Sequence, residues 1–181
     1  MSGTVATRLT FADLERLPES SRRQELLHGE LIELPPPKQK HNDVAHEIFH
    51  VLVEVVSAAH ASGIAGHLGK VYLGTGYRME DEGWLIPDVS ITHPGQKLED
   101  YYLGSPALAV EVISNEKTSD FIGQKIEEYL KNGALEVWVV YPSRGEIRVY
   151  RPDGTWRSYT RLFESELLAG ATIDLGKILV P

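Results

Sequence analysis

The sequence predicts an α/β or α+β fold in which a mixed β-sheet is flanked by helices. Strand-like runs alternate along the chain with amphipathic helical stretches. The succession of strand, helix and strand over residues 107–141 predicts a parallel crossover, because parallel neighbours need a long connection. At 181 residues, with no internal repeat and no low-complexity linker, the chain suits a single domain spanning residues 1–181.

Hydrophobic periodicity predicts helices over residues 10–17, 41–61 and 120–131. Thr10 is the expected N-cap of the first helix, with Asp13 completing an approximate capping box. The second helix has the strongest pattern and is expected to end at Gly63. The third is expected to be capped by Thr118 or Ser119.

The expected strands are short apolar runs bounded by turn residues. They lie at residues 25–34, 70–79, 84–92, 107–113, 135–141, 146–151 and 155–160. His28-Gly29 divides the first run into a hairpin, and Pro152-Asp153-Gly154 is expected to turn the last pair.

Composition excludes several classes of protein. The chain has no cysteine, which excludes disulfides, thiolate zinc sites and iron–sulfur clusters. No run approaches 18 apolar residues and the start lacks a signal-peptide core, so we expect a cytoplasmic protein without a membrane span. The net charge of −8 argues against non-specific wrapping of nucleic acid, although it allows a local basic patch or a metal that meets phosphate.

Two acidic residues interrupt apolar strands. Glu111 lies within the run at 107–113, and Asp88 follows Pro87 within the run at 84–92. Taken singly, Glu111 fits a solvated edge strand as well as a site, and Asp88 fits a local backbone hydrogen bond better. Two such acids on neighbouring strands instead favour a bound cation, because buried carboxylates rarely gather without one. Oxygen ligands without cysteine favour Mg²⁺ or Mn²⁺.

A lysine on the third helix is a candidate partner for these acids. Lys125 falls at the border of the apolar stripe, beside Ile122 and Tyr129. Its stem can run along the core and direct the ammonium to a site under the helix. The simpler alternative is a solvated lysine that pairs with Glu127 or Glu128.

The order of these motifs resembles the PD-(D/E)xK nuclease superfamily. The pattern is Pro87-Asp88, then Glu111-Val112 in an apolar strand, then a lysine. More closely, the chain resembles the family described as putative restriction endonucleases, from about Thr10 to Leu179. The resemblance implies a restriction-endonuclease-like core and a metal-dependent DNA endonuclease.

The resemblance also implies roles for individual residues. Asp88 and Glu111 would ligate Mg²⁺ or Mn²⁺, helped by the Val112 carbonyl, and the lysine would orient or deprotonate the attacking water and stabilise the phosphate. The usual lysine position is occupied by Ile113, so Lys125 is the candidate for a lysine that has moved to the next helix.

The resemblance places two supporting residues near the metal. Glu30 lies where the family carries an acid, and His41 lies where it often has a histidine. His41 falls on the apolar side of its helix, so a core histidine is an equal alternative.

Two other functions remain open. The acidic pI and Ile113 suit a catalytically degenerate nuclease fold that serves as a nucleic-acid-binding or assembly module. His46-Glu47-Ile48-Phe49-His50 matches the H-E-x-x-H pattern of zinc peptidases. However, the two histidines project away from the apolar stripe, which favours a solvated helix face. A homodimer or higher homo-oligomer is also expected, with the hairpin at 146–160 as a candidate edge.

Overall fold

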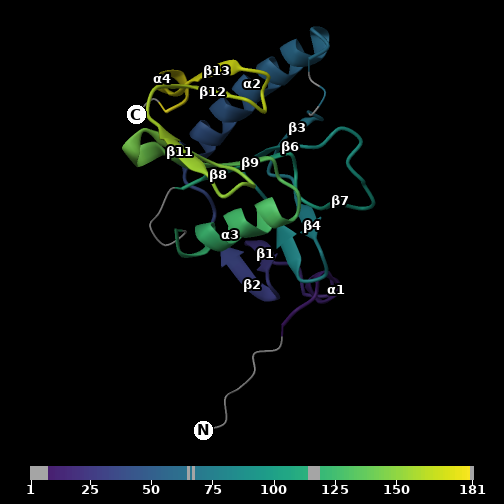
Figure 1. Ribbon diagram of the computed structural model, residues 1–181. Coiled ribbons are helices and arrows are strands. Elements are labelled where there is room, and N and C mark those ends of the chain that lie inside the picture. The colour runs from purple at the N-terminus through teal and green to yellow at the C-terminus, as the bar shows by residue number, and fades with distance from the viewer. Residues whose placement is uncertain (1–7, 65, 67, 114–118, 180–181) are drawn as a thin grey trace.

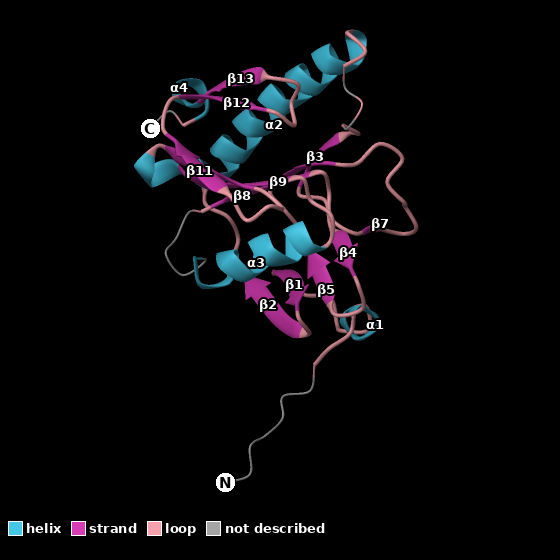
Figure 2. Cartoon of the chain, viewed as in Figure 1, coloured by secondary structure: helices cyan, strands magenta, loops and turns pink. Residues whose placement is uncertain are grey.

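The computed structural model describes residues 8–64, 66, 68–113 and 119–179. It confirms a mixed α+β architecture with sheets flanked by helices (Figures 1 and 2). The α-helices are α1 (Phe11–Leu14), α2 (Gln39–Ala61), α3 (Ser119–Lys131) and α4 (Leu175–Ile178). The predicted capping box at Thr10 and Asp13 is present, although α1 is shorter than expected. The predicted cap of α3 involves Thr118, which lies outside the described residues, and the Ser119 side chain, which is also not described.

A six-stranded sheet forms the centre of the molecule, in the order β11-β10-β9-β8-β6-β3. Its strands are β3 (Val71–Leu73), β6 (Val89–Ile91), β8 (Leu108–Val112), β9 (Glu136–Tyr141), β10 (Glu146–Tyr150) and β11 (Trp156–Tyr159). β8 and β9 are parallel and α3 connects them, which confirms the predicted crossover. The other pairings in this sheet are antiparallel.

A five-stranded sheet lies on the other side of α3, in the order β2-β1-β5-β4-β7. Its strands are β1 (Arg23–Leu27), β2 (Glu30–Leu34), β4 (Tyr77–Met79), β5 (Gly83–Leu85) and β7 (Tyr102–Leu103). The predicted hairpin is confirmed, and its turn residues His28 and Gly29 both have positive φ.

Two predicted strands prove to be two strands each, in different sheets. The run at 70–79 is divided into β3 and β4, and the run at 84–92 into β5 and β6. The first break contains Gly76, where a Cβ atom would lie only 2.1 Å from the Trp84 ring. The second contains Pro87, which cannot donate a hydrogen bond to a sheet. Each of these two runs therefore crosses once between the sheets, and Asp88 sits at the crossing within residues 84–92.

The last part of the chain contains elements beyond the predicted helices and strands. A short 3₁₀ helix, Pro142–Arg144, precedes β10, and β12 (Leu162–Ser165) pairs with β13 (Ala171–Asp174) ahead of α4. Ile173 and Ile178 belong to the same buried cluster as α2. The C-terminal hairpin therefore completes the cover over one face of the central sheet (Figure 1).

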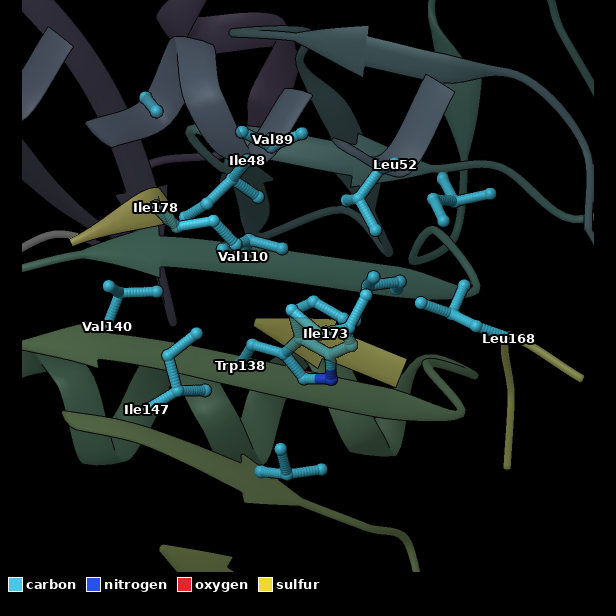
Figure 3. Packing of buried hydrophobic residues seen from close by; sticks show 14 of the residues in the cluster. Ile48, Leu52, Val89, Val110, Trp138, Val140, Ile147, Leu168, Ile173 and Ile178 are labelled. Carbon is cyan, nitrogen blue, oxygen red and sulfur yellow. The ribbon is translucent and has the colours of Figure 1, made fainter. Parts of the chain in front are cut away.

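The helices α2 and α3 cover opposite faces of the six-stranded sheet. Ile48 and Leu52 of α2 pack onto Val110 of β8, and Trp138 of β9 packs beside Ile173 (Figure 3). This packing accounts for the apolar composition of α2, which by length and composition alone would suffice to cross a membrane. On the other face, α3 is sandwiched between the two sheets.

Candidate active site

The two predicted acids meet on the α3 face of the central sheet. Glu111 lies in the middle of β8, and Asp88 immediately precedes β6, the antiparallel neighbour of β8. The Asp88 main-chain N–H donates to the Val110 carbonyl (2.9 Å), and its Oδ2 accepts from the Val112 N–H (2.7 Å). Asp88 is 8 % exposed and Glu111 is 6 % exposed. Asp88 thus does bond to backbone, but to the strand that carries Glu111.

Lys125 of α3 reaches these acids. Its Nζ lies 2.6 Å from Glu111 Oε1 and 3.0 Å from Oε2 of Glu25, and the side chain is buried. One turn further along α3, the Tyr129 hydroxyl donates to the same Glu111 oxygen (2.8 Å). The alternative of a solvated lysine paired with Glu127 or Glu128 is therefore wrong.

The cluster also contains two residues of β1, Arg23 and Glu25. The sequence patterns did not identify either of them as a site residue. Arg23 binds Asp88 Oδ1 through Nη1 (3.2 Å) and Glu25 Oε1 through Nη2 (2.8 Å). Glu25, only 1 % exposed, also accepts from the Ile86 N–H (3.1 Å). The available signal was period-two alternation, because Glu25 shares the inward face of β1 with the buried Leu27.

The structure does not bring Glu30 into this cluster. Glu30 pairs with Leu27 at the turn end of the hairpin and is exposed, whereas Ile32 pairs with Glu25. Glu30 is thus two residues, or about 7 Å, too far along the strand. The acid contributed by this hairpin is Glu25.

His41 faces the site from the first turn of α2. Its Nε2 lies 3.2 Å from Asp88 Oδ1, and the side chain is 13 % exposed. His46 and His50 of the H-E-x-x-H segment are both exposed. Within the described ranges, no set of three or more His, Asp or Glu side chains is arranged to hold a metal ion.

At both acids burial raises the pKa and the nearby cations lower it, but the net result differs between Glu111 and Asp88. Burial raises the pKa of Glu111 to about 7, although the charge of Lys125 opposes that rise. Burial would also raise the pKa of Asp88, but the His41 hydrogen bond and the charges of His41 and Arg23 outweigh it and lower that pKa. Asp88 is therefore the more strongly ionised acid.

Burial and charge also compete at the two bases. Burial tends to lower the pKa of Lys125, but Glu111 and Glu25 outweigh burial and raise it. Burial likewise opposes the His41 cation, and the hydrogen bond to Asp88 raises the His41 pKa despite it. Lys125 is consequently a buried cation rather than a neutral base.

A cavity of about 370 Å³ opens above the cluster. Its charged side is formed by Asp88, Glu111, Lys125, Arg23, Glu25 and His41. The rest of the lining is mostly apolar and includes Leu34, three consecutive prolines, Ile113 and Phe121, together with the charged Glu33 and Lys38. A concave, mostly apolar cavity with a few convergent polar groups is the usual form of a binding site.

The polar network around the cavity is incomplete. Arg23 Nε, Glu25 Oε2 and His41 Nδ1 are buried without a hydrogen-bond partner, although Glu25 Oε2 is close to the Lys125 charge. Buried polar atoms are normally paired, so these atoms suit a site that is completed by a ligand. Asp88 and Glu111 supply the oxygen donors that Mg²⁺ prefers, and Mg²⁺ commonly takes only one or two carboxylates beside phosphate and water. The donor set therefore fits such an ion.

Comparisons with known proteins place this geometry in context. A family model described as Uma2, putative restriction endonuclease, matches residues 11–176. Among solved structures, the chain is similar to a putative nuclease belonging to DUF820 from Anabaena variabilis ATCC 29413. The TM-score is 0.77 at 19 % identity, covering 94 % of this chain and 97 % of that one. This likeness confirms the expected nuclease fold. No curated protein matches the chain.

Proposed function

The chain belongs to the Uma2 family of putative restriction endonucleases, and on that premise we propose that it is a metal-dependent DNA endonuclease that hydrolyses phosphodiester bonds. The convergence of Asp88, Glu111 and Lys125 beside one cavity carries this proposal. Three parts of the chain far apart in sequence supply two oxygen donors and a cation there. Phosphoryl transfer needs those groups, because its chemistry is mainly positioning and charge stabilisation.

Asp88 and Glu111 would hold Mg²⁺ or Mn²⁺, with the Val112 carbonyl as a third donor. When bound, such an ion polarises the phosphate and lowers the pKa of a coordinated water. The Val112 N–H and His41 fix the orientation of the Asp88 carboxylate. Tyr129 does the same for Glu111.

Lys125 would stabilise the negative charge that develops on the phosphate. Because its pKa is raised, it enters the reaction as a cation and acts electrostatically rather than by removing a proton. Glu25 positions it through the second ion pair. The Arg23 guanidinium, 30 % exposed at the cavity, is a further group able to bind phosphate oxygens.

A second function is favoured by one specific observation. Arg23 and Lys125 form ion pairs with Asp88, Glu25 and Glu111, and His41 Nε2 lies 3.2 Å from Asp88 Oδ1. A catalytically degenerate module that binds nucleic acid without cutting it is compatible with that internal compensation.

The test is cleavage of supercoiled and single-stranded circular DNA with Mg²⁺ or Mn²⁺. We expect metal-dependent nicking that EDTA abolishes and that falls by at least about 100-fold in Glu111→Gln and Lys125→Met. Glu127→Gln and Lys131→Met change the same residue types on the exposed side of α3 and should leave the rate unchanged. Nicking that survives Glu111→Gln contradicts the assigned site, and DNA binding without nicking supports the degenerate module.

We also propose a single domain over residues 1–181, a cytoplasmic location and a homodimer or higher homo-oligomer. The homodimer is the first expectation, because two-fold assembly is the commonest symmetry of oligomers. Sedimentation of the purified chain measures this last point directly.

A further inference from the structure

The face of the central sheet that carries Glu111 continues beyond α3 onto β10 and β11. Glu111 pairs with Val139, Val139 with Arg148, and Arg148 with Ser158. Residues directly opposite one another on neighbouring strands project to the same face. Arg148 is therefore on the face of Glu111, two strand spacings or about 10 Å away.

Arginine and aromatic side chains gather on this extension, which we call the aromatic–arginine surface. It consists of Tyr141, Arg144, Arg148, Tyr150 and Trp156. The Arg148 guanidinium carbon lies 4.9 Å from the Tyr141 ring centroid and 5.6 Å from that of Trp156. The Arg144 guanidinium carbon lies 5.2 Å from the Tyr141 ring. The rings of Tyr150 and Trp156 stack at 6.0 Å.

The surface is preorganised and accessible. Glu146 accepts from Arg148 Nε (2.7 Å) and from the Ser158 hydroxyl (2.7 Å), which fixes the guanidinium in place. Trp156 is 54 % exposed and Arg144 is exposed. A large aromatic ring held open to solvent beside a guanidinium is suited to a ligand that offers both flat rings and negative charge.

The aromatic–arginine surface adjoins the cavity. Ile113 lines the apolar wall, and its N–H donates to the Val140 carbonyl (2.8 Å), which places it beside Tyr141 at the ends of β8 and β9. Ile113, Phe121 and Tyr141 all pack against the same buried cluster. The surface thus begins where the cavity wall ends.

We propose that the aromatic–arginine surface docks the single-stranded DNA that flanks the scissile phosphate, an inference that rests on the nuclease function proposed above. Aromatic faces stack on unpaired bases, and guanidiniums bind the phosphates between them. In a duplex the base faces are already stacked on one another. A single strand can also bend into the cavity, where both carboxylates are more than nine-tenths buried. The surface explains how a chain of net charge −8 engages a polyanion.

The experiment measures binding apart from cleavage. Fluorescence anisotropy of a labelled oligothymidylate of about 20 nucleotides is recorded in EDTA for the full chain. Arg148→Ala and Trp156→Ala should each weaken binding by about 10-fold, and Arg148→Ala should reduce the slope of log affinity against log salt by about 0.7. Arg157→Ala is the matched control. Arg157 lies on β11 but pairs with the buried Val149, so it projects to the other face and should change affinity less than about 2-fold.

Tryptophan emission gives a second readout. Stacking of a base on Trp156 should quench the emission of the wild type, and Trp156→Phe should remove most of the quenching while retaining most of the affinity. Trp138 is buried and Trp84 lies in β5 of the five-stranded sheet, so stacking of a base on Trp156 should leave the emission of both unchanged.

Several results overturn the inference. The first is wild-type affinity for the single strand in both Arg148→Ala and Trp156→Ala. The second is binding of the matching duplex as tight as that of the single strand. The third is a change of oligomeric state in Trp156→Ala with unchanged DNA binding. The last result assigns the surface to a subunit interface. Weakened binding by these variants without any cleavage by the wild type supports the surface and contradicts the nuclease function. If cleavage and DNA binding are unchanged in both variants, the docking role of the surface is wrong and the nuclease function stands.

Discussion

The two faces of the central sheet each bury a glutamate, and they treat it differently. On the α2 face, Glu136 accepts from Trp138 Nε1 (2.9 Å) and the Ser165 hydroxyl (3.0 Å) and pairs with Arg151 (3.1 Å). Its donor Trp138 belongs to the apolar core shown in Figure 3. On the α3 face, Glu111 belongs to a cluster of acids and bases that borders a cavity.

The difference teaches that burial of a charge does not by itself mark a functional site. Glu136 has one cation and two neutral donors, and it does not line the cavity. In the cluster around Glu111, by contrast, Arg23 Nε and His41 Nδ1 are buried without a hydrogen-bond partner, and burial raises the pKa of Glu111 to about 7. An arrangement that leaves charges incompletely compensated beside open space suits catalysis more than stability.

The largest expected effect concerns the apolar face. Leu52→Ala removes a fully buried side chain of α2 and should lower the free energy of unfolding by about 3 kcal/mol, from lost burial and the cavity left behind. Urea unfolding measures this change. The cleavage rate per folded molecule should remain that of the wild type, and Leu73→Ala, at a 39 % exposed site, is the control. A cleavage loss greater than the loss of folded protein would contradict the independence of the two faces.

A smaller effect separates the two glutamates. Glu136→Gln removes the partner of Arg151 and should lower the free energy of unfolding by about 2 kcal/mol. Glu111→Gln should lower it by less than about 1 kcal/mol, because Lys125 keeps its ion pair with Glu25 and the cost of burying one carboxylate disappears. Both are measured by urea unfolding. Equal losses would show that Glu111 is as structural as Glu136.

The sequence was most informative where one pattern has one physical meaning. Apolar periodicity located α2 and α3, and the hairpin turn at His28-Gly29 was visible as local chemistry. The break at Pro87 is hidden because apolar residues lie on both sides of it, whereas Gly74-Thr75-Gly76 is a turn signal that a single strand over residues 70–79 overlooks. Only the tertiary structure determines that each run serves two sheets.

The site was partly predictable for the same reason. Asp88 and Glu111 stand out as acids within apolar strands, whereas Lys125 needed the resemblance, because a lysine at the border of a helical stripe is usually solvated. Arg23 and Glu25 looked like ordinary polar residues of a hairpin, and their role depends on how β1 is placed against α3. Alternation along β1 places Glu25 on the inward face, but no local pattern shows that this face meets α3.

The smallest expected effect tests how finely the charged face is adjusted. Tyr129→Phe removes only the hydroxyl that donates to Glu111, and the ring stays in the core. The free energy of unfolding should fall by about 1 kcal/mol, the usual net value of one hydrogen bond. Tyr77→Phe is a matched control, because its buried hydroxyl bonds to Ser90 instead of an acid of the site.

The two tyrosine variants should diverge in cleavage although their stabilities change alike. If Tyr129 positions the Glu111 carboxylate, Tyr129→Phe should raise the Mg²⁺ concentration needed for half-maximal cleavage about 5-fold, whereas Tyr77→Phe should leave it unchanged. A metal titration of both variants at fixed DNA concentration measures this. Equal Mg²⁺ midpoints in the two variants would mean that the Tyr129 hydroxyl only stabilises the fold. Positioning of Glu111 would then depend on its other contacts.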